Sequence, residues 1–448
     1  MTKVVTDSSR QIDKELILRI APTNIKSYRT DRRELPAYRF VDLFNAIEAL
    51  CQNQNETVRI ESENSEDLNN LLHEKRQKWI SRKFTQASRL PWSVAPEKEV
   101  FLPADCFWVI EHDQSQLWII VRLKYNPLNA QSILEVASPD LPVGEEIMEK
   151  IIKISKKDSV YRNQTLEISF DAATKDEYGD VEKPAQLRLK FKRLDLIADE
   201  DLIIDEEVRK ILHRNVVDLH ERRELLKAHK VPIRRGVLFY GPPGTGKTYT
   251  CRYLCGKLLR TTRIMVKGSA LLQVGHMFQL ARLLQPAVIF LEDVDLVFMS
   301  REVNLYSSVL GDLLDHMDGL RPFEDIGFVL TTNAIERMEA AVRDRPGRIS
   351  QCIFFSPPNT ELRRRYLSHY LESYDCSKVD LALLVGDSEG ATQAFLKEWV
   401  HRAVQIASER VTENSSRLEL RTDDFKEALK EMRSFTDKTS ARIVGFHT

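Results

Sequence analysis

The chain has 448 residues, of which 42% are hydrophobic and 30% are charged, and its formal net charge is −1. This length is enough for two or three domains, each with its own core. The near-zero charge excludes the global positive field that holds proteins on nucleic acid or an anionic membrane. No apolar run reaches the roughly 20 residues that cross a bilayer, and the N-terminal segment lacks an apolar signal core. We therefore expect a cytoplasmic protein.

The first half of the chain predicts a flexible arm followed by an α+β domain. Residues 1–35 are polar and weakly patterned, which is typical of an arm. Apolar residues recur at helical spacing over 36–52 and again over 67–84, and the polar stretch 52–66 between them predicts a loop or a weak strand.

The apolar period then changes from helical to alternating. Residues 107–112 and 117–125 flank a short polar link and predict a hairpin, and residues 165–170 and 186–194 alternate as strands do. We therefore place an α+β domain with a substantial sheet at 36–195, where it would recognise a partner or set subunit packing.

The second half of the chain predicts an α/β domain with a helical appendage. The charged residues 196–235 predict a linker with one or two helices, and residues 236–358 alternate short apolar strands with helices, which indicates an open α/β sheet. Residues 359–436 are helical almost throughout and predict a small helical domain, which leaves 437–448 as a tail.

The segment GVLFYGPPGTGKT, residues 236–248, has the strongest functional pattern in the chain. A strand leads into G-x-x-x-x-G-K-[ST], and a helical pattern follows. The glycines let successive backbone N–H groups wrap phosphate oxygens, and the helix directs its positive end at them. We expect Lys247 to reach the β- and γ-phosphates and Thr248 to ligate magnesium. The predicted phosphate-binding residues are Gly241, Pro242, Pro243, Gly244, Thr245, Gly246, Lys247 and Thr248.

A second strand, 287–291, ends in two carboxylates, Glu292 and Asp293. Many ATP-hydrolysing sites place an aspartate first and a glutamate second, so the order here is reversed. Carboxyl ends of parallel strands are where ligands bind in open α/β sheets. Assigning roles by position, we predict that Glu292 holds magnesium, largely through water, and that Asp293 orients and deprotonates the attacking water.

Two further motifs follow in chain order. The strand 326–333 ends in Asn333, whose amide can bind the γ-phosphate or the attacking water. In RDRPGR, residues 343–348, a Pro-Gly turn fixes the directions of Arg345 and Arg348. Cations placed on the developing charge accelerate phosphoryl transfer, so we predict that these arginines are catalytic.

Together with LLDHMDGL at 313–320, these motifs occur in the order and rough spacing of AAA ATPases, and residues 205–435 resemble that family. Within it the chain is similar to the AAA-proper clade. The Glu-Asp order is similar to that of many bacterial members and of the branch that translocates the folded Rieske protein, although the chain shows no membrane helix.

The resemblance implies a P-loop NTPase core with a parallel five-stranded sheet and a C-terminal helical lid. It implies ATP and Mg²⁺ as cofactors and a homo-oligomeric ring, in the first instance a hexamer. Arg345 and Arg348 would then reach the neighbouring subunit's nucleotide. The segment EGATQAF is similar to the small-residue version of the sensor-2 position, which implies that Gly390 and Ala391 contact the nucleotide.

The resemblance is weakest at the pore. After the strand 263–266, AAA proteins continue with an aromatic-aliphatic-glycine step that grips a threaded polypeptide. Val274 and Gly275 fit the last two positions of that step, but Gln273 occupies the aromatic one. Whether the pore threads polypeptide stays open.

Three functions fit these features. The first is an ATP-driven machine that remodels a partner protein held by the N-terminal domain. The second is a scaffold or regulator that assembles with ATP and hydrolyses slowly. The third is a nucleic-acid-acting ATPase, suggested by the basic and aromatic segment KRQKWISRKF at 75–84. Such a run is more often a solvated helix face with its aromatic residues in the core.

Overall fold

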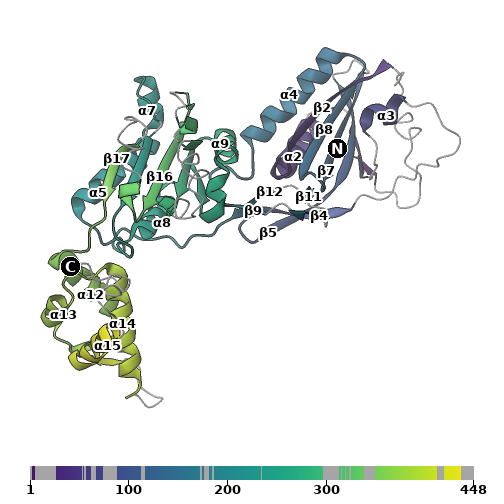
Figure 1. Cartoon of the computed structure of the whole chain (residues 1–448). Helices are drawn as coiled ribbons and strands as arrows, with labels where there is room; N and C mark the ends of the chain where they lie inside the picture. Colours follow the sequence, from purple (N-terminus) through teal and green to yellow (C-terminus); the bar gives the residue numbers. More distant parts are fainter. Residues whose placement is uncertain are drawn as a thin grey trace. The chain divides into compact units, whose positions relative to one another are not determined.

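The computed structural model divides the chain into two compact units, Met1–Arg193 and Leu194–Thr448 (Figure 1). None of the helices in the described part of the chain is long and apolar enough to cross a bilayer. The structure describes residues 3–5, 27–52, 54, 57–61, 67–73, 88–112, 117–171, 174–175, 181–183, 186–233, 235–295, 312–313, 315–317, 319–321, 324–337, 349–410 and 418–434.

The N-terminal unit is built on a six-stranded sheet of order β1-β3-β6-β7-β8-β2. β1 runs parallel to β3, and the other neighbours are antiparallel. The predicted hairpin over 107–112 and 117–125 is confirmed as β6 and β7. The strands are β1 (Lys3–Val5), β2 (Arg29–Pro36), β3 (Thr57–Glu61), β6 (Asp105–His112), β7 (Leu117–Asn126) and β8 (Gln131–Ser138).

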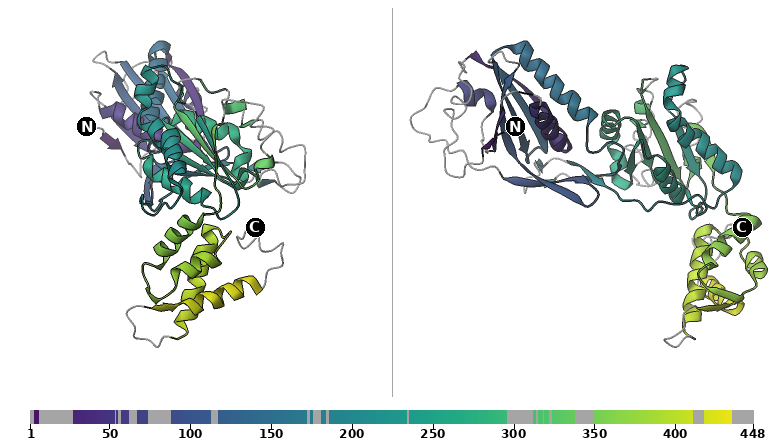
Figure 2. Two further views of the ribbon diagram at one scale, coloured as in Figure 1. Left: turned by 90° about the vertical axis from the view of Figure 1, so that its left-hand side faces the viewer. Right: turned by 180° about the vertical axis from the view of Figure 1, so that it is seen from behind.

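Both faces of this sheet are covered by helices, α2 (Phe40–Gln52) and α4 (Leu141–Lys157) on one and α3 (Leu68–His73) on the other (Figures 1 and 2). Side chains alternate across a strand. Trp108 therefore packs with α2 and α4, whereas its neighbour Phe107 packs with α3. This double burial explains why β6 and β7 contain continuous apolar runs. The predicted α+β fold of this region is confirmed.

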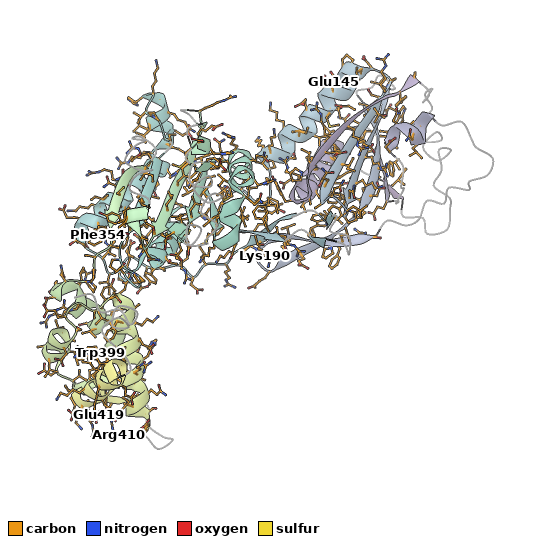
Figure 3. The ribbon with its side chains drawn as sticks, in the orientation of Figure 1. Glu145, Lys190, Phe354, Trp399, Arg410 and Glu419 are labelled. Atoms are coloured by element: carbon orange, nitrogen blue, oxygen red, sulfur yellow. The ribbon has the colours of Figure 1, made fainter. Side chains whose placement is uncertain are left out.

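Three hairpins complete the unit. β4 (Arg89–Ala95) pairs with β5 (Lys98–Pro103), β9 (Thr165–Asp171) with β12 (Gln186–Phe191), and β10 (Thr174–Lys175) with β11 (Val181–Lys183), all antiparallel. The alternating strands predicted from 165–170 and 186–194 are β9 and β12. Their alternation is visible in β12, where Lys190 is exposed (Figure 3) and Leu189 is half-buried.

The predicted flexible arm over residues 1–35 is wrong where β1 and β2 form. Every residue of β2 from Arg29 to Pro36 is in register with β8. The strand was hard to predict because it is highly charged and lies at the sheet edge, where backbone hydrogen bonds hold it and polar side chains are favoured. Residues 6–26, the basic and aromatic segment 75–84 and the tail 437–448 lie outside the described residues.

Asp42 on α2 is a buried carboxyl group that makes the stability of the N-terminal unit depend on pH. Its side chain is 1% exposed, and Oδ1 accepts a hydrogen bond from the Val160 N–H at 2.9 Å. Burial raises the pKa of Asp42 from its ordinary 3.8 to about 6, against the opposing hydrogen bonds from Ser159 and Val160 and the charge of Arg39. The folded protein therefore holds this proton more tightly than the unfolded chain does.

We expect the unfolding free energy to fall as pH rises from roughly 4 to 6, by about 3 kcal/mol from this group. The stabilisation is complete below the unfolded pKa and is lost as pH rises through the folded one. Asp42→Asn cannot titrate, so it should remove this part of the pH dependence in urea unfolding curves. Asp158→Asn, at an exposed carboxylate of the same unit, is the control. A wild-type slope in Asp42→Asn would contradict the assignment.

The C-terminal unit contains a parallel sheet of order β14-β15-β16-β13-β17, which confirms the expected five-stranded core. α8 (Lys247–Lys257) packs on one face with Phe239 and Phe290. On the opposite face Phe278 of α9 (Val274–Leu283) contacts Phe328, with ring centroids 5.3 Å apart. The strands are β13 (Arg235–Tyr240), β14 (Thr262–Val266), β15 (Ala287–Leu291), β16 (Ile326–Thr332) and β17 (Ile349–Phe354).

The predicted linker over 196–235 is part of this unit's core. It forms α5 (Glu206–Leu212), a π-helical segment (His213–Val217), α6 (Asp218–Glu221) and α7 (Arg223–Ala228). Leu212, Val216 and Val217 are buried in the same cluster as the central strands. High charge concealed this burial in the sequence, because the polar residues occupy the remaining faces of the short helices.

The predicted helical domain after residue 358 is a small lid subdomain. Its helices are α12 (Thr360–Leu371), α13 (Leu381–Asp387), α14 (Gln393–Ser408) and α15 (Thr422–Ser434). β18 (Asp375–Lys378) and β19 (Glu419–Arg421) pair in parallel. Trp399 is fully buried at its centre (Figure 3), and its indole N–H donates to the Phe425 carbonyl at 2.8 Å.

Candidate nucleotide-binding site

The glycine-rich loop joins β13 to α8 at the carboxyl end of the sheet, as predicted. Gly241, Gly244 and Gly246 all have positive φ angles, of 143°, 79° and 94°, a region that L side chains rarely adopt. At Gly246 an added Cβ would also lie 1.8 Å from the Gln393 amide nitrogen. The Gln393 side chain could move aside, so at Gly246 the backbone conformation is what requires glycine, whereas at Gly241 an added Cβ would also lie 2.3 Å from the backbone oxygen of Phe355.

Lys247, the first residue of α8, points back into the loop. Its side chain is 5% exposed, and Nζ donates to the carbonyl oxygens of Gly241 at 2.7 Å and Pro242 at 2.8 Å. Burial lowers the pKa of Lys247 to about 8, although the charges of Asp293 and Asp295 act in the opposite direction. Phosphate oxygens beside this ammonium would favour its charged form.

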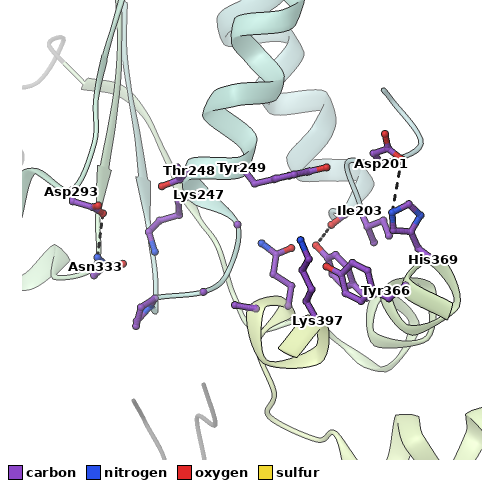
Figure 4. A pocket seen from close by; sticks show the side chains of 16 residues that line it. Asp201, Ile203, Lys247, Thr248, Tyr249, Asp293, Asn333, Tyr366, His369 and Lys397 are labelled. Atoms are coloured by element: carbon purple, nitrogen blue, oxygen red, sulfur yellow. Dashed lines mark hydrogen bonds and ion pairs between the residues drawn. The ribbon is translucent and has the colours of Figure 1, made fainter. Parts of the chain in front are cut away.

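The loop, the strand ends and the lid enclose a pocket of about 620 Å³ (Figure 4). That volume lies within the range usual for small-molecule sites. From the predicted site the pocket wall includes Pro243, Gly244, Gly246, Lys247, Thr248, Asp293 and Asn333. Gly241, Pro242 and Thr245 frame the loop behind this wall, with Thr245 Oγ1 donating to the Pro242 carbonyl at 2.8 Å.

The two acids after β15 lie in different environments. Asp293 lines the pocket, has a positive φ of 52°, and its backbone N–H donates to Thr331 Oγ1 at 2.9 Å. Glu292 is 2% exposed and its Oε2 forms an ion pair with Lys267 Nζ at 2.6 Å. Glu292 Oε1 is buried and has no hydrogen-bond partner within the described part of the chain. The sequence did not single out Lys267.

Asn333 joins the pocket wall beside Asp293, as its position at the end of β16 predicted. Its side-chain Nδ2 donates to Asp293 Oδ1 at 3.4 Å (Figure 4). Its backbone N–H donates to Asp295 Oδ1 at 3.0 Å. The amide and the carboxylate are therefore held as a pair facing the same space. Arg345 and Arg348 lie outside the described residues, so their predicted catalytic role stays a prediction.

The far end of the pocket is lined by residues that we did not predict. The Tyr366 hydroxyl donates to the Ile203 carbonyl, and His369 lies 3.9 Å from Asp201 (Figure 4). Burial raises the pKa of Tyr370 to about 12, so this phenol remains a hydrogen-bond donor at neutral pH. Residues 366, 369 and 370 are spaced i, i+3 and i+4 on α12, a pattern that could have revealed a shared face.

Gly390 and Ala391, which we predicted to contact the nucleotide, are not among the residues that line the pocket. Ala391 is fully buried in the lid core, and Gly390 occupies a turn with a positive φ of 75°. The lid instead presents the first turns of α14, because Gln393, Ala394 and Lys397 line the pocket. Contact of Gly390 and Ala391 with the nucleotide stays a prediction, and the α14 residues that line the pocket lie a few positions further along the chain.

The expected pore step at 273–275 coincides with the start of a helix. Gln273 precedes α9, whose first residue, Val274, is only 5% exposed. A residue buried in the core cannot extend to grip a substrate. Val274 therefore fits the family's pore position in sequence but not in environment.

Two of the predicted residues offer oxygen ligands for a magnesium ion: Thr248 lines the pocket, whereas Glu292 is buried and is not among the residues that line it. The predicted ligands, Thr248 and Glu292, offer a hydroxyl and a carboxylate, which are the hard donors that Mg²⁺ prefers. The unpartnered buried Oε1 of Glu292 is the structural observation in favour of such a ligand. Within the described residues no group of three or more His, Cys, Asp or Glu side chains could hold a metal alone. Mg²⁺ commonly completes its shell with water and phosphate oxygens.

A family model described as "ATPase family associated with various cellular activities (AAA)" matches residues 237–357. This part of the chain is an AAA domain. The match covers the P-loop, the acid pair and Asn333, so the family resemblance inferred from the motifs is confirmed at this level. The parallel sheet and the C-terminal helical lid are those that the resemblance implied.

Curated relatives match about half of the chain. The "26S proteasome regulatory subunit 8 homolog" of Schizosaccharomyces pombe is 30% identical over 43% of this chain and 52% of the relative. The "ATP-dependent zinc metalloprotease FtsH 2" of Thermoanaerobacter sp. is 29% identical over 52% of this chain and 46% of the relative. The chain thus spans about half the length of these two relatives. A solved structure, "Crystal structure of FIGL-1 AAA domain in complex with ADP", has a TM-score of 0.45, with 20% identity over 56% of this chain and 93% of that chain.

Proposed function

We propose that this protein is an ATPase that couples ATP binding and hydrolysis to the remodelling of a partner protein. The observation that carries the proposal is the meeting of Lys247, Thr248, Asp293 and Asn333 in one pocket. A cation and a hydroxyl at a helix N-terminus suit phosphates and magnesium, and a carboxylate paired with an amide suits the attacking water.

In this proposal each residue has one task. Lys247 and the loop N–H groups hold the β- and γ-phosphates, and Thr248 and Glu292 hold Mg²⁺, which when bound supplies charge neutralisation at the phosphates. Asp293 accepts the proton of the attacking water, while Asn333 holds that carboxylate and the water in line. The adenine-ribose end would occupy the part of the pocket near Tyr366 and Tyr370.

We further propose that the subunits form a ring, with a hexamer as the first expectation, in which Arg345 and Arg348 act on the neighbouring subunit's nucleotide. The Arg345→Ala, Arg348→Ala double variant should keep ATP affinity within about twofold and lose at least tenfold in turnover. Mixing it with the binding-deficient Lys247→Ala variant should restore part of the activity, since each supplies what the other lacks. Intact turnover in the double variant would contradict catalysis across a subunit boundary.

A scaffold that hydrolyses slowly is the second candidate, and the burial of Val274 at the pore position supports it, because a buried side chain cannot grip a substrate. Mass photometry with and without ATP tests assembly for both candidates. A remodeller should show turnover that rises when its partner, captured on the ATP-bound Asp293→Asn protein, is added back. A scaffold should assemble with ATP and keep its output when hydrolysis is blocked.

A nucleic-acid-acting ATPase is the third candidate and rests on residues 75–84 alone. A salt-sensitive gel shift with duplex or single-stranded DNA or RNA would favour it. Absence of any shift at low salt would remove it.

A further inference from the structure

The reversed order of the acid pair has a structural partner in Lys267. Lys267 directly follows β14 and Glu292 directly follows β15, and these strands are parallel neighbours. Their register pairs Val266 with Leu291, so the next residues along the two strands stand opposite each other. The Glu292 N–H also donates to the Val266 carbonyl at 3.2 Å. The fold therefore brings the two side chains together at the carboxyl end of the sheet, next to the pocket residue Asp293.

The contact between them is close and sheltered. Lys267 Nζ lies 2.6 Å from Glu292 Oε2, and the Glu292 side chain is 2% exposed. A buried carboxylate without a compensating charge is costly. The Lys267 ammonium, at 39% exposure, can supply that charge while its own stem remains partly hydrated. One carboxylate oxygen is thus committed to Lys267, and the other, Oε1, is left without a protein partner within the described residues.

We propose that Lys267 is a positioning residue that fixes the Glu292 carboxylate for the magnesium-nucleotide complex, and that a glutamate stands first in the acid pair because only it reaches Lys267. An aspartate at position 292 would withdraw the carboxylate by about 1.5 Å, the length of one carbon–carbon bond. The separation from Nζ would grow to roughly 4 Å, the limit of an ion pair. This inference rests on the proposed function, because it assigns a supporting residue to the same site.

If Lys267 positions Glu292, the acid pair should not tolerate exchange of its two residues. Restoring the common order, in Glu292→Asp, Asp293→Glu, should impair the protein, although it recreates the pattern of many active ATPases. The loss should come mainly from position 292. In a Lys267→Met background, by contrast, Glu292→Asp should cost little more, because the partner that distinguishes the two acids is already gone.

A double-mutant cycle tests this directly with Lys267→Met, Glu292→Asp and the combination. Each single variant should lower kcat and raise the magnesium concentration needed for half-maximal nucleotide binding, each on the order of tenfold. The double variant should resemble the worse single variant and not the product of the two. Lys267→Arg should restore most of the magnesium dependence. Lys378→Met, which removes a lysine paired with Glu419 at 2.8 Å in the lid, is the matched control and should behave as wild type.

Two further measurements separate positioning from folding and from the proposed function. In urea unfolding of the nucleotide-free protein, the effects of the substitutions at positions 267 and 292 on the free energy of unfolding should also be non-additive. We expect this result whether or not the wild type hydrolyses ATP. Failure of wild-type turnover with that coupling intact would overturn the ATPase proposal alone. Additive effects, a fully active order-restored variant, or lost stability with unchanged magnesium dependence would each overturn the role of Lys267.

Discussion

Asp293→Asn should bind ATP with near wild-type affinity and lose turnover by about a thousandfold. The carboxylate lines the pocket beside Asn333, where it can accept a proton from water within one hydrogen bond or one bridging water. Asparagine preserves the shape of the side chain but cannot take that proton. General base catalysis contributes roughly 10²–10⁴ in rate, which sets the size of the loss. Phosphate release and equilibrium binding of a fluorescent ATP analogue measure the two quantities separately.

Glu292→Gln provides the comparison that decides which acid does which task. It should weaken binding of ATP in the presence of magnesium and leave magnesium-free binding unchanged. Asp387→Asn, at an exposed lid carboxylate, should match the wild type in both assays. Normal turnover in Asp293→Asn together with an inactive Glu292→Gln would show that our assignment by position is inverted.

Lys247→Ala should reduce ATP affinity by a hundredfold or more, on the order of the value of two charge-assisted hydrogen bonds. The ammonium is already held within the loop by the carbonyls of Gly241 and Pro242, so it is placed before any phosphate arrives. Its loss removes the positive charge and leaves two buried carbonyl groups without their donor. Isothermal titration of ATP and ADP should show the larger loss for ATP, because Lys247 is assigned to the β- and γ-phosphates.

Lys257→Ala is the matched control for this experiment. It lies on the same helix, α8, but at the other end, where Nζ pairs with Asp199 at 2.7 Å. The same substitution there should leave ATP affinity within about twofold of the wild type. Equal losses in the two variants would mean that α8 itself is disturbed, and unaltered binding in Lys247→Ala would refute the phosphate role.

The residues of the nucleotide site that belong to a local sequence motif could be predicted from the sequence. A phosphate-binding loop needs particular residues at particular spacing, so Gly246, Lys247 and Thr248 can be recognised as its members from the sequence alone. Strand ends are also local, and both Asp293 and Asn333 reach the pocket as expected. The acids were recognised together, but their different surroundings depend on which neighbouring strand ends beside them.

Features that arise from pairing between distant segments were not predictable in this way. Lys267 lies opposite Glu292 only because of the register of β14 with β15, and the sequence does not show that register. Gln393 and Lys397 were not predicted as pocket residues, because the sequence does not reveal where α14 begins relative to the loop. Strand β2 looked like an arm because its charged residues show little apolar alternation, although β8 provides a full set of backbone partners.

The start of α14 touches the phosphate loop through main-chain atoms, since the Ala394 N–H donates to the Gly244 carbonyl at 3.2 Å. A contact of this kind is indifferent to side-chain substitution and stiff in its geometry. If the loop rearranges when a nucleotide binds, this hydrogen bond would therefore shift α14 as a rigid body, and the lid would move with it. Movement of the lid would then be transmitted by main-chain hydrogen bonds, which cannot be recognised from the identity of individual side chains.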